Sequence, residues 1–207
     1  VWLTAAPERA RMVHEELGVW TGAPERGSTC PAPEALFYEP TPWEPETVRQ
    51  RIAVLSLLAS EGDLCEPTPL VVAPIWAVMV KTLPPALLRG GIRALKLGQY
   101  RPPGDLAAAW LRFGYQPTAV VEEPGTFSVR GGIVDVFPPH LPQPVRIEFV
   151  GDEIESLRVF DPATQRSGER VQSAQVIPAS EALMSQGPRA ASALRQQDWR
   201  DLAPALR

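Results

Sequence analysis

Residues 126–160 read TFSVRGGIVDVFPPHLPQPVRIEFVGDEIESLRVF, and this stretch decides the fold of the second half of the chain. Across 145–150 (VRIEFV) every second residue is apolar and the first two between them are charged, a period of two that is typical of a strand with one buried face. The Gly-Asp pair at 151–152 is a candidate hairpin turn, and a return strand is expected at 154–160. The stretch therefore predicts antiparallel β-structure.

Working outward from this stretch, we expect further strands at 118–122 and 126–137. Arg130-Gly131-Gly132 interrupts the second of these, and its glycines permit a bulge or a close backbone approach. A helix is expected at about 105–113, with Asp105 as its cap. Residues 92–178 are accordingly predicted to form an antiparallel α+β domain.

The first part of the chain has a different pattern. A short apolar strand at 1–5 precedes a helix, a second helix is expected at about 46–60, and 70–73 has the composition of a buried strand. Alternating strands and helices predict an α/β layer with parallel strands over 1–91. Residues 179–207 are expected to be mainly helical.

Composition excludes several classes of protein. The chain has 207 residues, of which 44% are hydrophobic and 21% charged, as in globular domains, and its 24 prolines indicate short elements. The formal net charge of −4 does not favour bulk binding to a phosphate backbone. The longest apolar run, 70–80, is interrupted by Pro74 and is shorter than the ~20 residues of a membrane span. The two cysteines lack zinc-site spacing.

The sequence offers no catalytic centre that we can defend. It contains no Gly-rich phosphate loop followed by Lys and Ser or Thr. Both histidines, His14 and His140, stand outside any recognisable nucleophile arrangement. The carboxylates at 152–155 are typical of a solvated hairpin tip. We therefore predict no catalytic residue, no cofactor and no metal.

Arg130 and Arg146 leave two interpretations open. The strand arginines, with Arg158 among them, can solvate the outer face of the sheet and pair with Glu148 and Glu155, at little gain in stability. Alternatively Arg130 and Arg146 form a patch that grips an acidic partner through bidentate hydrogen bonds.

Several irregular motifs occur together in order. They include PGTFSVRGGIVDVFPP, PVRIEFVGDEIESLRVFDPATQRS and VIPASE, with LKLGQ at 95–99 and FGY at 113–115. This combination closely resembles the N-terminal UvrB-homology module of bacterial transcription-repair coupling factors. The similarity is dense from 70 to 181. It is looser at 33–39 (PEALFYE), where Pro33 and Phe37 replace the family's Trp and Pro.

The resemblance implies a degenerate RecA-like α/β domain at 1–91, an inserted antiparallel α+β domain at 92–178 that binds UvrA, and a helical return to the first domain at 179–207. It implies a non-catalytic cytoplasmic module that recruits nucleotide excision repair to RNA polymerase stalled at DNA damage. RNA polymerase, DNA and the ATP-driven motor are expected to involve other domains of the full-length protein, and no membrane is implied.

The resemblance also implies the residues that contact UvrA, which are Arg130, Arg146 and Phe149. Val150 stands where the family has a second aromatic residue. From these positions we expect that truncating both arginines abolishes UvrA association and leaves the melting temperature nearly unchanged. The alternative functions are a nucleic-acid-binding module and a fragment of a UvrB-like excision-repair helicase. The second is disfavoured because 18–69 holds no Tyr-rich hairpin insert for clamping DNA.

Overall fold

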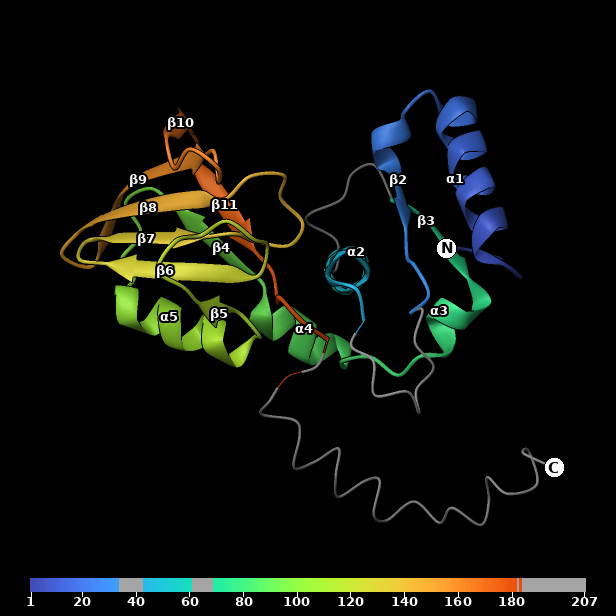
Figure 1. Cartoon of the computed structure of the whole chain (residues 1–207), viewed down its shortest axis with the longest axis horizontal. Coiled ribbons are helices and arrows are strands. Elements are labelled where there is room, and N and C mark those ends of the chain that lie inside the picture. Colours follow the sequence, from blue (N-terminus) through green and yellow to red (C-terminus); the bar gives the residue numbers. More distant parts are fainter. Residues whose placement is uncertain (34–42, 61–68, 182, 184–207) are drawn as a thin grey trace, which may run out of the picture.

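A computed structural model of the chain describes residues 1–33, 43–60, 69–181 and 183 (Figure 1). Within them the strands are β1 (Trp2–Thr4), β2 (Gly27–Thr29), β3 (Leu70–Pro74), β4 (Arg93–Lys96), β5 (Gln116–Pro117), β6 (Thr126–Arg130), β7 (Ile133–Val136), β8 (Val145–Val150), β9 (Glu153–Phe160), β10 (Ser167–Arg170) and β11 (Ser173–Val176). The helices are α1 (Pro7–Thr21), the 3-10 turn η1 (Pro24–Arg26), α2 (Pro45–Ala59), α3 (Ile75–Met79), α4 (Pro85–Gly91) and α5 (Pro103–Arg112).

The first part of the chain is an open parallel sheet of order β1-β3-β2 with a helix on each side (Figure 1). Val72 of β3 packs on Ala10 and Val13 of α1. Its neighbours in sequence, Val71 and Ala73, point the other way and belong to a cluster with Val54 of α2. Because β3 is buried on both faces, its residues form a continuous apolar run, as expected for parallel strands.

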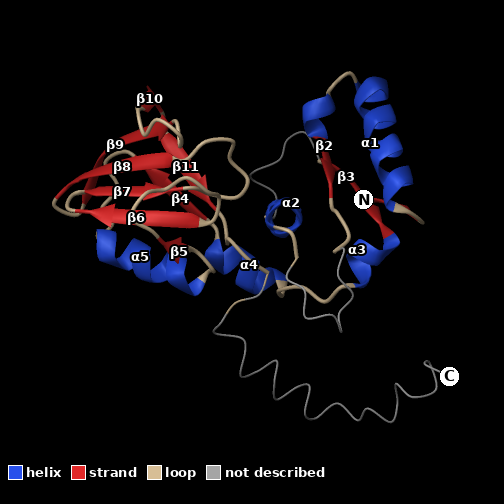
Figure 2. Cartoon of the chain, in the orientation of Figure 1, coloured by secondary structure: helices blue, strands red, loops and turns tan. Residues whose placement is uncertain are grey.

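The second part is a six-stranded open sheet of order β10-β9-β8-β7-β6-β5, antiparallel except for the β5–β6 pair. The helix α5 lies along one side of it (Figure 2). The first and last strands of this part, β4 and β11, pair antiparallel, with Arg93 opposite Val176 and Lys96 opposite Ser173. The chain thus enters and leaves this region along neighbouring strands.

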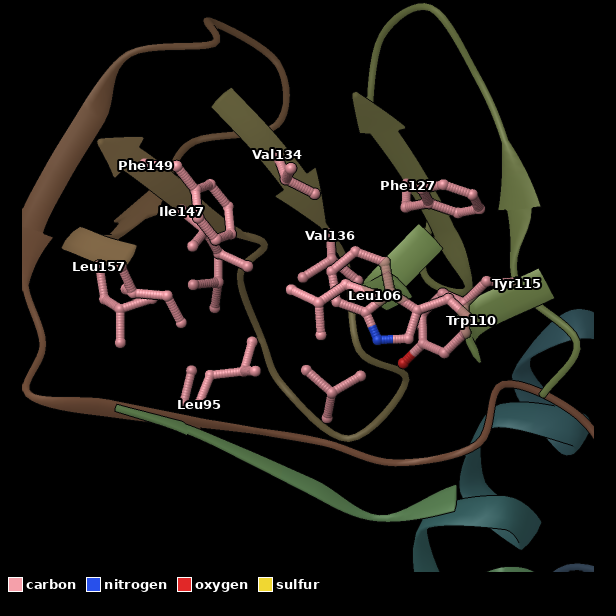
Figure 3. Packing of buried hydrophobic residues seen from close by; sticks show 14 residues of the cluster. Leu95, Leu106, Trp110, Tyr115, Phe127, Val134, Val136, Ile147, Phe149 and Leu157 are labelled. Atoms are coloured by element: carbon pink, nitrogen blue, oxygen red, sulfur yellow. The ribbon is translucent and has the colours of Figure 1, made fainter. Parts of the chain in front are cut away.

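The main core lies between one face of the large sheet, α5 and the β4–β11 pair (Figure 3). Trp110 of α5 is 2% exposed and meets the Phe127 ring edge-on at a centroid distance of 5.6 Å. From the other strands come buried side chains that include Val145, Ile147 and Phe149. The period of two at 145–150 therefore identified the buried face of β8 correctly.

Three details of the sequence prediction are wrong. Residues 126–137 form a hairpin rather than one interrupted strand, because Gly131 adopts a left-handed φ of +58° and reverses the chain between β6 and β7. Residues 118–122 follow the two-residue strand β5 without forming a strand, with a bend at 119–120, and Val121 packs with Phe137 and Phe160. Asp105 does not cap α5, since the helix is preceded by Pro102 and contains Asp105 in its first turn.

The two parts of the chain are joined by a buried ion pair. Arg51 of α2 is 1% exposed and its Nε lies 2.7 Å from Glu181 Oε1, beyond the end of β11. The same guanidinium donates to the carbonyl oxygens of Pro31 and Ala77. The predicted helix at 190–206 lies outside the described residues, as does most of the one at 181–184.

Candidate protein-docking site

The face of the large sheet opposite the main core carries the predicted arginines. Cross-strand register places Ser128 of β6, Asp135 of β7 and Arg146 of β8 in one row. One step towards the hairpin turn, Arg130, Ile133 and Glu148 form the next row. Arg130 and Arg146 therefore project from the same face, although their strands are not direct neighbours, since β7 lies between them.

Asp135 connects the two arginines. Its side chain is 0% exposed, and its Oδ2 accepts a hydrogen bond from Arg130 Nη2 at 2.8 Å. Arg146 grips the same carboxylate with two donors, Nε to Oδ1 at 2.8 Å and Nη2 to Oδ2 at 2.9 Å. Planar bidentate pairs of this kind are among the stronger hydrogen-bonded contacts in proteins. We call these three residues the Arg-Asp-Arg bridge.

Arg146 is the fixed member of the bridge. Its guanidinium carbon lies 4.7 Å from the centroid of the Phe160 ring, and Nη1 donates to the Gln165 carbonyl and to Ser167 Oγ. The hydrogen bonds to Asp135 raise the pKa of Arg146 above its ordinary value. Its ion-pair partner is thus Asp135, and the alternative in which Arg146 pairs with Glu148 is not what the structure contains.

Arg130 is the exposed member. Its side chain is 51% exposed, against 15% for Arg146. Among the described residues it makes the single polar contact with Asp135, so its other N–H donors face solvent. Two cations sharing one anion leave the bridge with a net positive charge. Arg130 is consequently the guanidinium that a carboxylate of a partner can reach without breaking the fold.

A shallow hollow of about 470 Å³ lies over the bridge, lined by Arg130, Arg146, Val120, Ile133 and Gln165. Val120 and Ile133 are 41% and 38% exposed, so apolar surface lies beside the two guanidinium groups. An apolar rim around charged groups excludes water from a contact and strengthens it. The hollow therefore suits a partner that presents an acidic side chain flanked by apolar ones.

Phe149 lies on the opposite face. It is 8% exposed and belongs to the main core, while its neighbour Val150 is 63% exposed on the face of the bridge. A direct contact between Phe149 and a partner remains a prediction. Its burial favours a supporting role, in which the ring holds β8 in place behind Arg146.

Sequence reasoning did not identify Asp135 as part of this site. The signal was present, because Asp135 is the one polar residue in the apolar strand 133–136, and a buried carboxylate requires a partner. Arg146 also contacts the Phe160 ring and the Gln165 carbonyl oxygen. Both residues are distant from Arg146 in sequence, so no local sequence pattern indicated these contacts. Among the described residues no cluster of His, Cys, Asp and Glu is placed to hold a metal ion.

No helix in the described part of the chain is long and apolar enough to cross a membrane.

Residues 94–181, which contain the bridge, match the UvrB interaction domain family. The chain is 38% identical over 167 residues to the transcription-repair-coupling factor of Myxococcus xanthus, covering 80% of this chain. It is 33% identical over 154 residues to that of Bacillus subtilis and 34% identical over 131 residues to that of Escherichia coli, covering 74% and 63% of this chain. These alignments span 14%, 13% and 11% of the three relatives.

Proposed function

We propose that the chain, which matches the UvrB interaction domain family at 94–181 and is similar to part of the transcription-repair-coupling factors, is a docking module for UvrA. In this role it brings nucleotide excision repair to RNA polymerase that has stalled at damaged DNA. The Arg-Asp-Arg bridge is the observation that carries the proposal, because it offers a net positive, partly desolvated surface on a rigid sheet.

We propose that Arg130 supplies the exposed contact with a UvrA carboxylate and that Arg146 orients it through Asp135. In the proposal Phe149 stabilises the strand from the core face. The hollow lined by Val120 and Ile133 receives the apolar neighbours of that carboxylate.

The proposed domain organisation is a degenerate RecA-like domain at 1–91, an inserted domain at 92–178 and a return to the first domain at 179–207. The antiparallel pairing of β4 with β11 supports the insertion, since both crossings then lie close together. The buried Arg51–Glu181 pair supports the return of the chain to the first domain. Parallel strand order β1-β3-β2 with helices on both faces is consistent with a RecA-like ancestry.

We propose that the chain has no catalytic activity of its own and acts in the cytoplasm. ATP hydrolysis and the contacts with DNA and RNA polymerase are assigned to other parts of a full-length protein, because the alignments span 14% or less of the three relatives.

Isothermal titration of the chain with purified UvrA tests the proposal. We expect saturable binding, with one chain at each docking site of UvrA. The affinity should fall as the salt concentration increases, because charged groups form the contact. Absence of binding at low and moderate salt would refute the proposal.

A further inference from the structure

A second polar hollow lies at the junction between the two sheets, beside α2, which stands between them in Figure 1. It has a volume of about 440 Å³. Its polar lining comes from α1, β2, α2 and the loop after β7, and consists of Arg11, His14, Ser28, Thr29, Arg49, Gln50 and His140. We call it the α2 cleft. It shares no lining residue with the hollow over the Arg-Asp-Arg bridge.

The chemistry of the α2 cleft is one-sided. Every polar side chain in the described lining can donate a hydrogen bond, and none is an Asp or a Glu. Arg11 is exposed and makes no ion pair or side-chain hydrogen bond within the described residues. Arg49 and Gln50, by contrast, both donate to the Glu46 carboxylate, and Arg49 also donates to the carbonyl oxygen of Pro139, so these two side chains hold the wall in place. A wall of donors with an unpaired cation at its edge is suited to an anion.

Both histidines of the chain lie in this lining. In each ring Nδ1 is buried without a hydrogen-bond partner in the described structure. The His14 ring is packed against the β2 backbone, since a Cβ on Gly27 would lie 2.6 Å from its Cε1. With Nδ1 sealed, Nε2 is the ring atom left to meet a ligand. A neutral imidazole protonated at Nε2 donates there, which again favours an acceptor-rich anion.

A smaller hollow of about 300 Å³ continues from the cleft and shares Ser28, Ala53, Val54 and His140 with it. Its other lining residues are the apolar Leu57 and Ile177 and the uncharged polar Ser56, Ser60 and Gln175. A ligand with an anionic group in the α2 cleft can therefore place an uncharged body beside these side chains. We propose that the α2 cleft binds a small phosphate monoester, with the phosphate between Arg11 and the two imidazoles and the body in the smaller hollow.

Because the chain contains two histidines, ring proton NMR of the intact chain reports on the cleft directly. Inorganic phosphate is titrated at constant pH and ionic strength against a chloride reference. Both His signals should shift saturably with one common midpoint, in the millimolar range, because the cleft supplies a single Arg that has no ion-pair partner among the described residues. Shifts that grow linearly with concentration, or different midpoints for the two rings, would overturn the site.

Matched variants and a second probe sharpen the test. Arg11→Ala should weaken phosphate binding at least about threefold, whereas Arg9→Ala, which removes an exposed α1 cation paired with Glu16 outside the cleft, should leave it unchanged. Equal effects of the two variants would overturn the role of Arg11. Phenyl phosphate should bind at least about threefold more tightly than inorganic phosphate. Equal or weaker binding would overturn the assignment of the smaller hollow to the ligand body.

Discussion

Replacing Arg146 by Met would leave the buried Asp135 carboxylate with Arg130 as its remaining cationic partner. Met keeps an apolar stem over the Phe160 ring, so the variant isolates the loss of charge and hydrogen bonds from the loss of packing. Two donors to Asp135 are removed, together with the contacts to Gln165 and Ser167.

The magnitude follows from burial. Arg146 is 15% exposed and Asp135 0%, so the pair is treated as buried, and removing one member of a buried pair costs about 3–5 kcal/mol. The lower end applies because Arg130 still reaches Oδ2. A loss of about 3 kcal/mol corresponds to a fall of about 6–12 °C in melting temperature for a chain of this size.

Urea denaturation and a thermal melt measure this cost, with Arg158→Met as the matched control. Arg158 stands opposite Arg146 on β9, on the same face, and makes no ion pair in the described structure. The control should change the unfolding free energy by less than about 0.5 kcal/mol. Adding Asp135→Asn to Arg146→Met should restore part of the stability, since the buried carboxylate charge, which then has only Arg130 as a partner, is removed. If Arg146→Met costs no more than Arg158→Met, the reasoning about the bridge is refuted.

Three further outcomes are expected. Arg51→Met should cost about 3–5 kcal/mol because it strands the buried Glu181, whereas Arg49→Met, on the same helix, removes a largely exposed pair and should cost about 1 kcal/mol or less in urea denaturation. Burial lowers the pKa of His140 from 6.5 to about 4. Between these pH values the unfolded chain binds more protons than the folded chain, so the free energy of unfolding falls as the pH falls. In acid titrations His140→Gln should therefore lose less unfolding free energy than the parent chain between pH 6.5 and 4. Equilibrium dialysis at micromolar ATP should detect no saturable binding, since no Gly-rich phosphate loop is present.

Helices and strands were predicted well where the pattern of residues adjacent in sequence is enough to show which side chains are buried. The alternation at 145–150 fixed both the strand and its buried face. The apolar run at 70–73 indicated a strand covered on both faces, which the packing of α1 and α2 on β3 confirmed. The helices predicted at about 46–60 and 105–113 agree with α2 and α5 to within two residues at each end.

The missed features depend on contacts between distant residues. A glycine pair in a strand predicts either a bulge or a turn, and the left-handed φ of Gly131 that decides between them is not a property of composition. The carboxylate of Asp135 pairs with arginines from the strands on both sides of β7, so its role can be recognised only once the pairing register of the three strands is known. The buried state of Arg146 depends on Phe160 and Gln165. The expected unchanged melting temperature of the double arginine variant therefore does not follow from the structure.

The structure assigns different contributions to the two arginines of the bridge, one mainly to folding stability and one mainly to partner binding, which the sequence could not distinguish. Truncation of Arg146 should affect both folding and binding, whereas truncation of the exposed Arg130 should affect binding and little else. Arg130→Ala is thus the cleaner test of docking, with Arg170→Ala as the control, since Arg170 is an exposed arginine on the edge strand β10 of the same sheet.

The central claim is that the exposed guanidinium of the Arg-Asp-Arg bridge docks UvrA, and isothermal titration of UvrA with these two variants tests it most directly. Loss of a desolvated interfacial charge typically costs about 2–5 kcal/mol of binding, which is a loss of about thirtyfold or more in affinity. Arg130→Ala should show that loss with a nearly unchanged melting temperature, and Arg170→Ala should bind like the parent chain. Equal affinity of Arg130→Ala and the parent chain for UvrA would contradict the account.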